Sequence, residues 1–235
     1  MRIGVLGAGN MADALATQWA RAGHEVMIGA RTPAKAVALA EAIGDGARGG
    51  SLREAAVFGE VVLLAVWYDG AQDALKAAGG AEGTLSGRVL VDCTNPTGPP
   101  DFTLWTRNDA SAAQQVAESA PGARVVKAFN LCHESVWRLT PPVFDGRPLG
   151  VPLCGDDEGA VDVVRSLVRD LGCVPMTGGG LERAGQLEAV AAFAIGLYAR
   201  GADPASMFPP MEAAFGGRTG LPNDFRDIRS CRPGE

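Results

Sequence analysis

Short apolar runs alternate along the chain with segments in which apolar residues recur at helical spacing. The first run, residues 3–6, leads into a glycine-rich turn and then into Leu15, Trp19 and Ala22, which share one helix face. The near-continuous apolar run at residues 60–67 is typical of a strand in the middle of a parallel sheet. This alternation predicts an α/β fold.

The same pattern predicts the remaining elements. Further strands are expected at residues 25–28 and 123–129. Residues 88–100 are expected to form a strand that leads into a proline-rich loop. Residues 148–176 continue this pattern, with a strand, a helix that begins with acidic residues, and another strand. Ser51 and Glu54 have the spacing of a capping box. Helices are also expected at residues 69–78, 110–119 and 181–201.

The turn after the first strand carries the residues Gly-Ala-Gly-Asn-Met-Ala at positions 7–12, which match G-x-G-x-x-G/A. Gly7 permits a tight turn, Gly9 lets the backbone approach a pyrophosphate, and Ala12 lets the helix lie close to the strand. The helix N-terminus then offers free N–H groups to phosphate oxygens. Because the motif lies between a strand and a helix, it predicts a bound dinucleotide; the alternative is a tight turn without a ligand.

Two basic residues follow the second strand, where many dinucleotide enzymes carry an acid that binds the ribose 2′-hydroxyl of NAD. Arg31 suits a 2′-phosphate, and Lys35 adds a second positive charge one helical turn later. Thr32 can donate a hydroxyl and cap the helix that Pro33 begins. Since no acid occurs at residues 28–32, the pattern favours NADP(H) over NAD(H); the alternative is an ordinary solvated helix start.

Composition narrows the class of protein. The net charge of −6 argues against a general nucleic-acid binder. Five scattered cysteines without a C-x-x-C pair suggest neither a disulfide framework nor a zinc site, and the acidic residues 156–158 are interpreted as a helix cap, so no metal is expected. The chain has no apolar run of membrane-spanning length, and its first strand begins directly after Met1 and Arg2. We expect a cytoplasmic protein without a membrane partner.

Five segments together resemble a known family: "RIGVLGAGNMA", "IGARTPAK", "VDCTNPTG", "ARVVKAFN" and "VPLCGDDEGA". Their order and spacing are similar to those of the NADPH-dependent oxidoreductases of the deazaflavin coenzyme F-420. The resemblance implies a Rossmann-type, doubly wound, mostly parallel sheet with a small C-terminal helical part, usually in a homodimer. It implies a dinucleotide-binding domain at residues 1–178 and a C-terminal helical segment and tail at residues 179–235.

The resemblance also implies roles for individual positions. In this family hydride passes directly between C4 of the nicotinamide and C5 of the deazaflavin. The deazaflavin side would involve Asn130 and Cys132. The NADP side would involve Gly7, Ala8, Gly9, Asn10 and Met11 at the pyrophosphate, Ala30, Arg31, Thr32 and Lys35 at the 2′-phosphate, and Ala65, Val66, Trp67, Asn95 and Ala128 toward the nicotinamide.

Two residues are candidates for catalysis if the reaction needs a proton donor. Hydride exchange between two cofactors can proceed largely by alignment, whereas a carbonyl or imine substrate would need an acid. His133 lies three residues after Asn130, and Tyr68 follows the fourth strand. Either residue could instead be a bystander, and Cys93 and Cys132 could be small buried residues without a chemical role.

Three functional hypotheses follow. The first is an enzyme that exchanges hydride between NADP(H) and coenzyme F-420 or a related flavin. The second is an NADPH-dependent reductase of a small carbonyl or imine compound, and the third is an NADPH sensor without turnover. The helix at residues 181–201 has a broad apolar side, formed by Leu187, Val190, Phe193, Ala194, Leu197 and Tyr198, which predicts burial against the Rossmann domain or in a homodimer.

Overall fold

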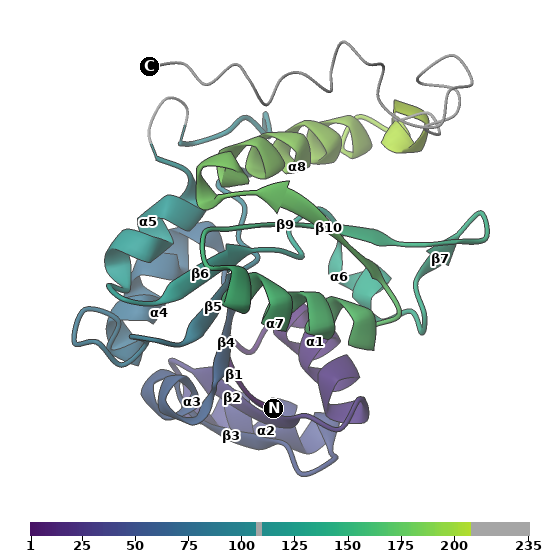
Figure 1. Ribbon diagram of the computed structural model, residues 1–235. Helices are drawn as coiled ribbons and strands as arrows, with labels where there is room; N and C mark the ends of the chain where they lie inside the picture. The colour runs from purple at the N-terminus through teal and green to yellow at the C-terminus, as the bar shows by residue number, and fades with distance from the viewer. Residues whose placement is uncertain (107–109, 208–235) are drawn as a thin grey trace. The chain divides into compact units, whose positions relative to one another are not determined.

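The computed structural model describes residues 1–106 and 110–207, and Figure 1 shows the arrangement of their elements. The chain divides into two compact units, Met1–Phe193 and Ala194–Glu235. The first unit contains an eight-stranded sheet with helices on both faces, together with a separate two-stranded hairpin. The predicted α/β fold of Rossmann type is confirmed.

The sheet has the strand order β10-β9-β6-β5-β4-β1-β2-β3. From β3 to β6 all neighbours are parallel, which is the doubly wound order with its switch point between β1 and β4. β9 pairs antiparallel with β6, and β10 pairs parallel with β9. The strands are β1 (Arg2–Leu6), β2 (Glu25–Ala30), β3 (Arg48–Ser51), β4 (Val61–Leu64), β5 (Val89–Asp92), β6 (Arg124–Lys127), β9 (Gly150–Gly155) and β10 (Val174–Gly179).

Helices cover the two faces of the sheet through two buried clusters. Alternate residues of a central strand enter opposite clusters: Val61 and Leu63 face one, and Val62 and Leu64 face the other. This double burial explains the continuous apolar run in the sequence. One face is covered by α1 (Asn10–Arg21), α2 (Pro33–Ile43) and α7 (Glu158–Asp170), the other by α3 (Leu52–Phe58), α4 (Ala71–Ala78) and α5 (Ala112–Ser119).

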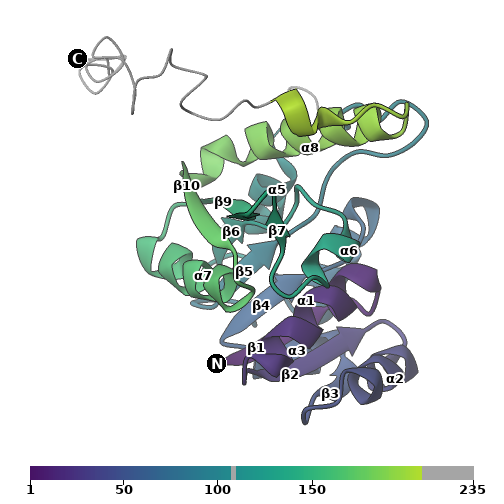
Figure 2. The ribbon, with the colours of Figure 1, turned by 90° about the vertical axis from the view of Figure 1, so that its right-hand side faces the viewer.

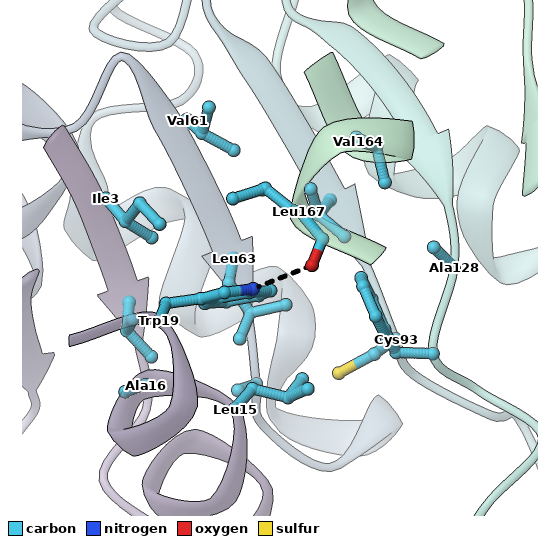
Figure 3. Close-up of a cluster of buried hydrophobic side chains, with 14 of the residues drawn as sticks. Ile3, Leu15, Ala16, Trp19, Val61, Leu63, Cys93, Ala128, Val164 and Leu167 are labelled. Atoms are coloured by element: carbon cyan, nitrogen blue, oxygen red, sulfur yellow. Dashed lines mark hydrogen bonds between the residues drawn. The ribbon is translucent and has the colours of Figure 1, made fainter. Parts of the chain in front are cut away.

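Aromatic residues tie α1 into the core. The indole N–H of Trp19 donates a hydrogen bond to the backbone oxygen of Leu167 in α7, at 3.3 Å (Figure 3). Phe129 lies edge-on between Trp19 and Trp137, with ring centroids 5.7 and 5.4 Å away. Phe129 has a φ of 60°, which an L-residue rarely adopts, so packing on both sides of its ring holds the chain in this conformation just after β6.

The last helix begins within the first unit. A 3-10 turn, η2 (Leu181–Arg183), precedes α8 (Ala184–Tyr198), and Ala184, Glu188, Ala191 and Ala192 are buried. The first compact unit accordingly extends to Phe193. The domain boundary expected after residue 178 stays a prediction. In the second unit the structure describes the end of α8 and η3 (Pro204–Met207), while most of the predicted tail lies outside the described residues.

Several short elements were absent from the sequence prediction. They are β3, whose Arg-Gly-Gly-Ser sequence lacks apolar residues, α6 (Glu134–Trp137), η1 (Tyr68–Gly70) and the hairpin of β7 (Val143–Phe144) and β8 (Arg147–Pro148). The predicted strand at residues 60–67 is shorter than expected, because the chain leaves the sheet after Leu64. Among the described residues, none of the helices combines the length and apolar character that crossing a membrane requires.

Candidate functional site

The glycine turn after β1 has the conformation that its sequence predicts. Gly7 has a φ of +132°, and its N–H donates to the backbone oxygen of Gly29 at 2.8 Å. A Cβ at this position would lie 2.2 Å from the backbone oxygen of Ala65. Gly7 is therefore required by the fold, since it lets β1 and the end of β4 approach each other.

Gly9 has a different role. It is exposed, has extended backbone and is the N-cap of α1, and a Cβ there would meet no protein atom within 4 Å. The fold therefore does not need glycine at this position, but a ligand close to the backbone would. The first-turn N–H groups of α1 and the positive end of its dipole lie here, and Ala12 is fully buried as predicted. The turn fits a pyrophosphate.

The segment after β2 presents positive charge to solvent. Ala30 is the last residue of the strand, while Arg31, Thr32 and Lys35 are exposed. Within the described residues no carboxylate oxygen lies within 4.0 Å of the Arg31 or Lys35 side chain. Thr32 is the N-cap of α2, as predicted, but its side chain makes no capping hydrogen bond, so the hydroxyl is not used within the helix.

On the other side of the switch point, an asparagine lies three residues after the end of β5 and another three residues after the end of β6. Asn95 donates from Nδ2 to the backbone oxygen of Asn130 at 2.7 Å, and Asn130 donates from Nδ2 to Oδ1 of Asn95 at 3.0 Å. Oδ1 of Asn130 is buried and has no partner among the described residues. Asn95, predicted to lie toward the nicotinamide, and Asn130, predicted to contact the second substrate, are therefore brought together, and two hydrogen bonds orient them.

The other residues predicted along this edge differ in exposure. Val66 lies against Gly7, and Trp67 after it is 85% exposed. Ala128 is fully buried and belongs to the core cluster in Figure 3, together with Cys93. Only the backbone of Ala128 could therefore face a ligand. Ala8 and Met11 are partly buried against the same core.

A buried ionic cluster contacts the backbone of Thr94, the residue before Asn95. Lys127 Nζ donates to Asp92 Oδ2 at 2.8 Å and to the backbone oxygen of Thr94 at 2.6 Å, and it lies 2.8 Å from Glu188 Oε1. All three charged side chains are fully buried. The carboxylate of Glu188 also accepts the first N–H groups of α5, from Ala112 and Ala113. These contacts join β5, β6, α5 and α8 at one point.

This cluster is not among the sites that the sequence predicts. Lys127 lies at the end of an apolar strand and Glu188 within a mostly apolar helix. A charged residue inside such a run is the signal that could have identified a buried pair, although not its partner. Burial by itself would lower the pKa of Lys127, but attraction to Asp92 and Glu188 outweighs it and raises the pKa above 10.5.

The structure separates the two candidate proton donors. The Tyr68 hydroxyl donates to Oε1 of Gln115 in α5 at 2.9 Å. His133 is the N-cap of α6, where its ring contacts Ser135 and Glu134, and α6 lies beside α1 (Figure 2). Glu134 in turn accepts from the side chain of Asn10 at 3.1 Å. His133 is thus linked to the pyrophosphate turn.

The cysteines near this edge are shielded thiols. Burial raises the pKa of Cys132 to about 11, and burial together with the charge of Asp92 raises that of Cys93 to about 12. Both therefore stay protonated near neutral pH and are poor nucleophiles. Among the described residues no three His, Cys, Asp or Glu side chains form a group that could hold a metal ion.

A Rossmann fold with an open glycine turn and two exposed cations after its second strand defines the class: this is an NADP-dependent oxidoreductase. Residues 2–96 match the family described as NADP oxidoreductase, coenzyme F420-dependent. The F420-dependent NADP reductase of Methanothermobacter marburgensis is 31% identical, over 84% of this chain and 92% of that protein. The chain belongs to this coenzyme F420-dependent family.

Two further similarities show how much of other proteins this chain matches. The metalloreductase STEAP3 of Rattus norvegicus is 31% identical over 80% of this chain, but the chain spans only 36% of that protein's length. The crystal structure of a candidate F420-dependent NADP reductase from Arthrobacter sp. FB24 superposes with a TM-score of 0.75 at 29% identity, covering 85% of this chain and 95% of that one. The fold is therefore shared with this structure over most of its length.

Proposed function

We propose that the protein transfers hydride between NADP(H) and the deazaflavin coenzyme F-420 or a related flavin. The observation that carries this proposal is the match to an F420-dependent NADP reductase over 92% of that protein's length. A match of this extent includes both the NADP half and the edge of the sheet where a second substrate would meet the nicotinamide. When bound, the nicotinamide supplies a hydride, which carries two electrons.

The described residues support an orientation for NADP(H). Arg31 and Lys35 would hold the 2′-phosphate, because they are exposed cations without a described carboxylate partner. Gly9 and the N-terminus of α1 would hold the pyrophosphate. The nicotinamide half would then extend across the switch point toward Val66, Trp67 and the Asn95–Asn130 pair.

The polar groups near that edge favour transfer by alignment over transfer with a protein acid. The Tyr68 hydroxyl is engaged with Gln115, Lys127 is fully buried, and His133 belongs to the pyrophosphate end. None of these groups offers a free proton at the end of β6. Hydride exchange between two rings needs their orientation and the exclusion of water, which fixed backbone and amide groups can provide.

Absorbance assays of NADPH with oxidised coenzyme F-420, riboflavin 5′-phosphate or a cyclic imine test the proposal. We expect turnover with F-420 or the flavin and little with the imine. Turnover with the imine alone would establish the second hypothesis of a small-substrate reductase. Binding of NADPH with no turnover of any of them would favour the sensor.

Gly9→Ala tests the NADP half separately. The added Cβ meets no protein atom, so the fold should be unchanged, while the methyl group would occupy space next to the pyrophosphate. We expect the NADPH Kd to rise by about tenfold or more, or about 1.4 kcal/mol. Gly70→Ala is the matched control, because a Cβ there also has open space. Equal NADPH affinity of the two variants would contradict the assigned pyrophosphate site.

We also propose that the protein is a homodimer. Val190 and Phe193, on the part of α8 within the first unit, are 39% and 61% exposed, so the predicted burial of this apolar side is not achieved within that unit. A second copy could cover these residues. Light scattering at micromolar concentration should give twice the chain mass, and a monomer would contradict the proposal.

A further inference from the structure

The tryptophans fall into two groups. Trp19 and Trp137 are buried and pack edge-on against Phe129. Trp67 and Trp105 are 85% and 50% exposed. A large apolar ring costs free energy when it faces water, so two exposed indoles in one region point to a bound molecule.

Trp105 packs against Tyr68, the residue that follows Trp67. The rings of Tyr68 and Trp105 are 6.1 Å apart and tilted by 51°. The Tyr68 hydroxyl is anchored on Gln115, whose own side chain donates to the backbone oxygen of Ala110 at 2.9 Å. The hydroxyl end of Tyr68 is therefore tied to α5.

The proline-rich loop after β5 holds Trp105. The backbone N–H of Trp105 donates to the backbone oxygen of Pro96 at 2.8 Å. Its indole lies so close to Gly98 that a Cβ there would be 2.8 Å from Cζ2. The loop thus keeps the ring against Tyr68 while half of its surface stays exposed.

These rings lie at the functional edge of the sheet. Trp67 and Tyr68 follow β4, and the loop that carries Trp105 follows β5, the neighbouring parallel strand. Ligands of this fold bind outside the carboxyl ends of such strands, close to the switch point. The rings therefore border the region assigned to the nicotinamide half of NADP(H).

We propose that Trp67, Tyr68 and Trp105 form a stacking surface for the flat, fused-ring system of the second substrate. This proposal rests on the hydride exchange proposed above and names the chemical class that the enzyme selects. Aromatic side chains bind planar heterocycles face to face without reading their edges. A small aliphatic carbonyl or imine compound has no ring face to stack, so this surface selects against it.

Trp105→Ala is the principal test, because Trp105 has no assigned role in NADP(H) binding and is half exposed. We expect the Kd of oxidised F-420 or riboflavin 5′-phosphate for the NADP⁺-loaded protein, measured by titration calorimetry, to rise about tenfold or more. The NADPH Kd should change less than about twofold. Trp105→Phe should recover part of the affinity, because it restores a ring face. Phe144→Ala, which removes an equally exposed ring from the β7–β8 hairpin, should have no effect.

The outcomes separate the two proposals. Calorimetric binding that depends on Trp105 without turnover supports the stacking surface and rejects hydride exchange. Turnover of F-420 that is unaffected by Trp105→Ala keeps hydride exchange and overturns the surface. If neither ring compound binds, or if Trp105→Ala only changes the oligomeric state, the exposed rings do not serve a flat substrate.

Discussion

Lys127 and Arg31 are basic residues at the carboxyl ends of parallel strands in the same sheet, but their surroundings are opposite. Lys127, at the end of β6, is fully buried with Asp92, Glu188 and a backbone oxygen as partners. Arg31, just after β2, is exposed, and no carboxylate of the described residues pairs with it. Strand position alone therefore does not distinguish a cation that is paired within the fold from an exposed cation that is available to bind an anionic ligand.

Burial makes the distinction. Moving a charge out of water costs several kcal/mol, so a buried cation must have its partners within the fold. An exposed cation is solvated at little cost and can wait for an anion from outside. Lys127 is thus held by partners within the fold, whereas Arg31 is free to act in the NADP(H) binding proposed above.

The largest expected effect is on folding. Lys127→Met keeps most of the volume but leaves two buried carboxylates without a cation, so the free energy of unfolding should fall by about 3–5 kcal/mol. Arg31→Met is the matched control, and its stability should change by less than about 0.5 kcal/mol. Urea denaturation measures both. Equal losses in the two variants would break the distinction.

The next effect is on cofactor affinity. Arg31→Ala removes a charge-assisted contact to the 2′-phosphate and should weaken NADPH binding by about 1.5–3 kcal/mol. NADH lacks this phosphate, so its affinity should barely change. Calorimetric titration of both cofactors checks the prediction. If the unmodified protein binds NADPH and NADH equally well, the role given to Arg31 is wrong.

Salt should affect the two charged regions differently. Raising ionic strength from about 0.1 M to about 1 M shortens the screening length to about 3 Å, which weakens attraction between exposed cations and a phosphate. NADPH affinity should fall several-fold, and this dependence should shrink in Arg31→Ala. The stability difference between the unmodified protein and Lys127→Met should stay constant, because the buried cluster excludes the ions. A strong salt dependence of that difference would indicate that the cluster is solvated.

The smallest expected effect is that of moderate pH on the buried cluster. The pKa of Lys127 is raised above its ordinary 10.5, so its contribution is present in full below that value and is lost only as the pH rises through the raised pKa. Between about pH 7 and about pH 9.5 the stability difference between the unmodified protein and Lys127→Met should therefore be unchanged. A steady decrease across this range would mean that the lysine loses its proton too early for the described pairing.

Local pattern predicted much of the fold and the conformation of the glycine turn, while the residues given to NADP(H) stay a prediction. Gly7, Gly9 and Arg31 follow directly from the strand–turn–helix–strand pattern, because short-range geometry determines what each must do. The antiparallel direction of β9 and the burial of Glu188 could not be predicted, because both depend on contacts between distant segments. Ala128 was expected to face the ligand, but the side to which a strand-end residue points is set by the register of the whole sheet.

The position of Glu188 has a consequence for how such proteins can recombine. Asp92, Lys127 and Glu188 lie in three separate stretches of sequence, yet both buried carboxylates have Lys127 as their cation. A crossover between two related genes that exchanged α8 alone would pair Lys127 of one parent with the residue that the other parent carries at position 188. Viable chimaeras should therefore inherit the three positions together, or join their parents beyond Phe193, where the first compact unit ends.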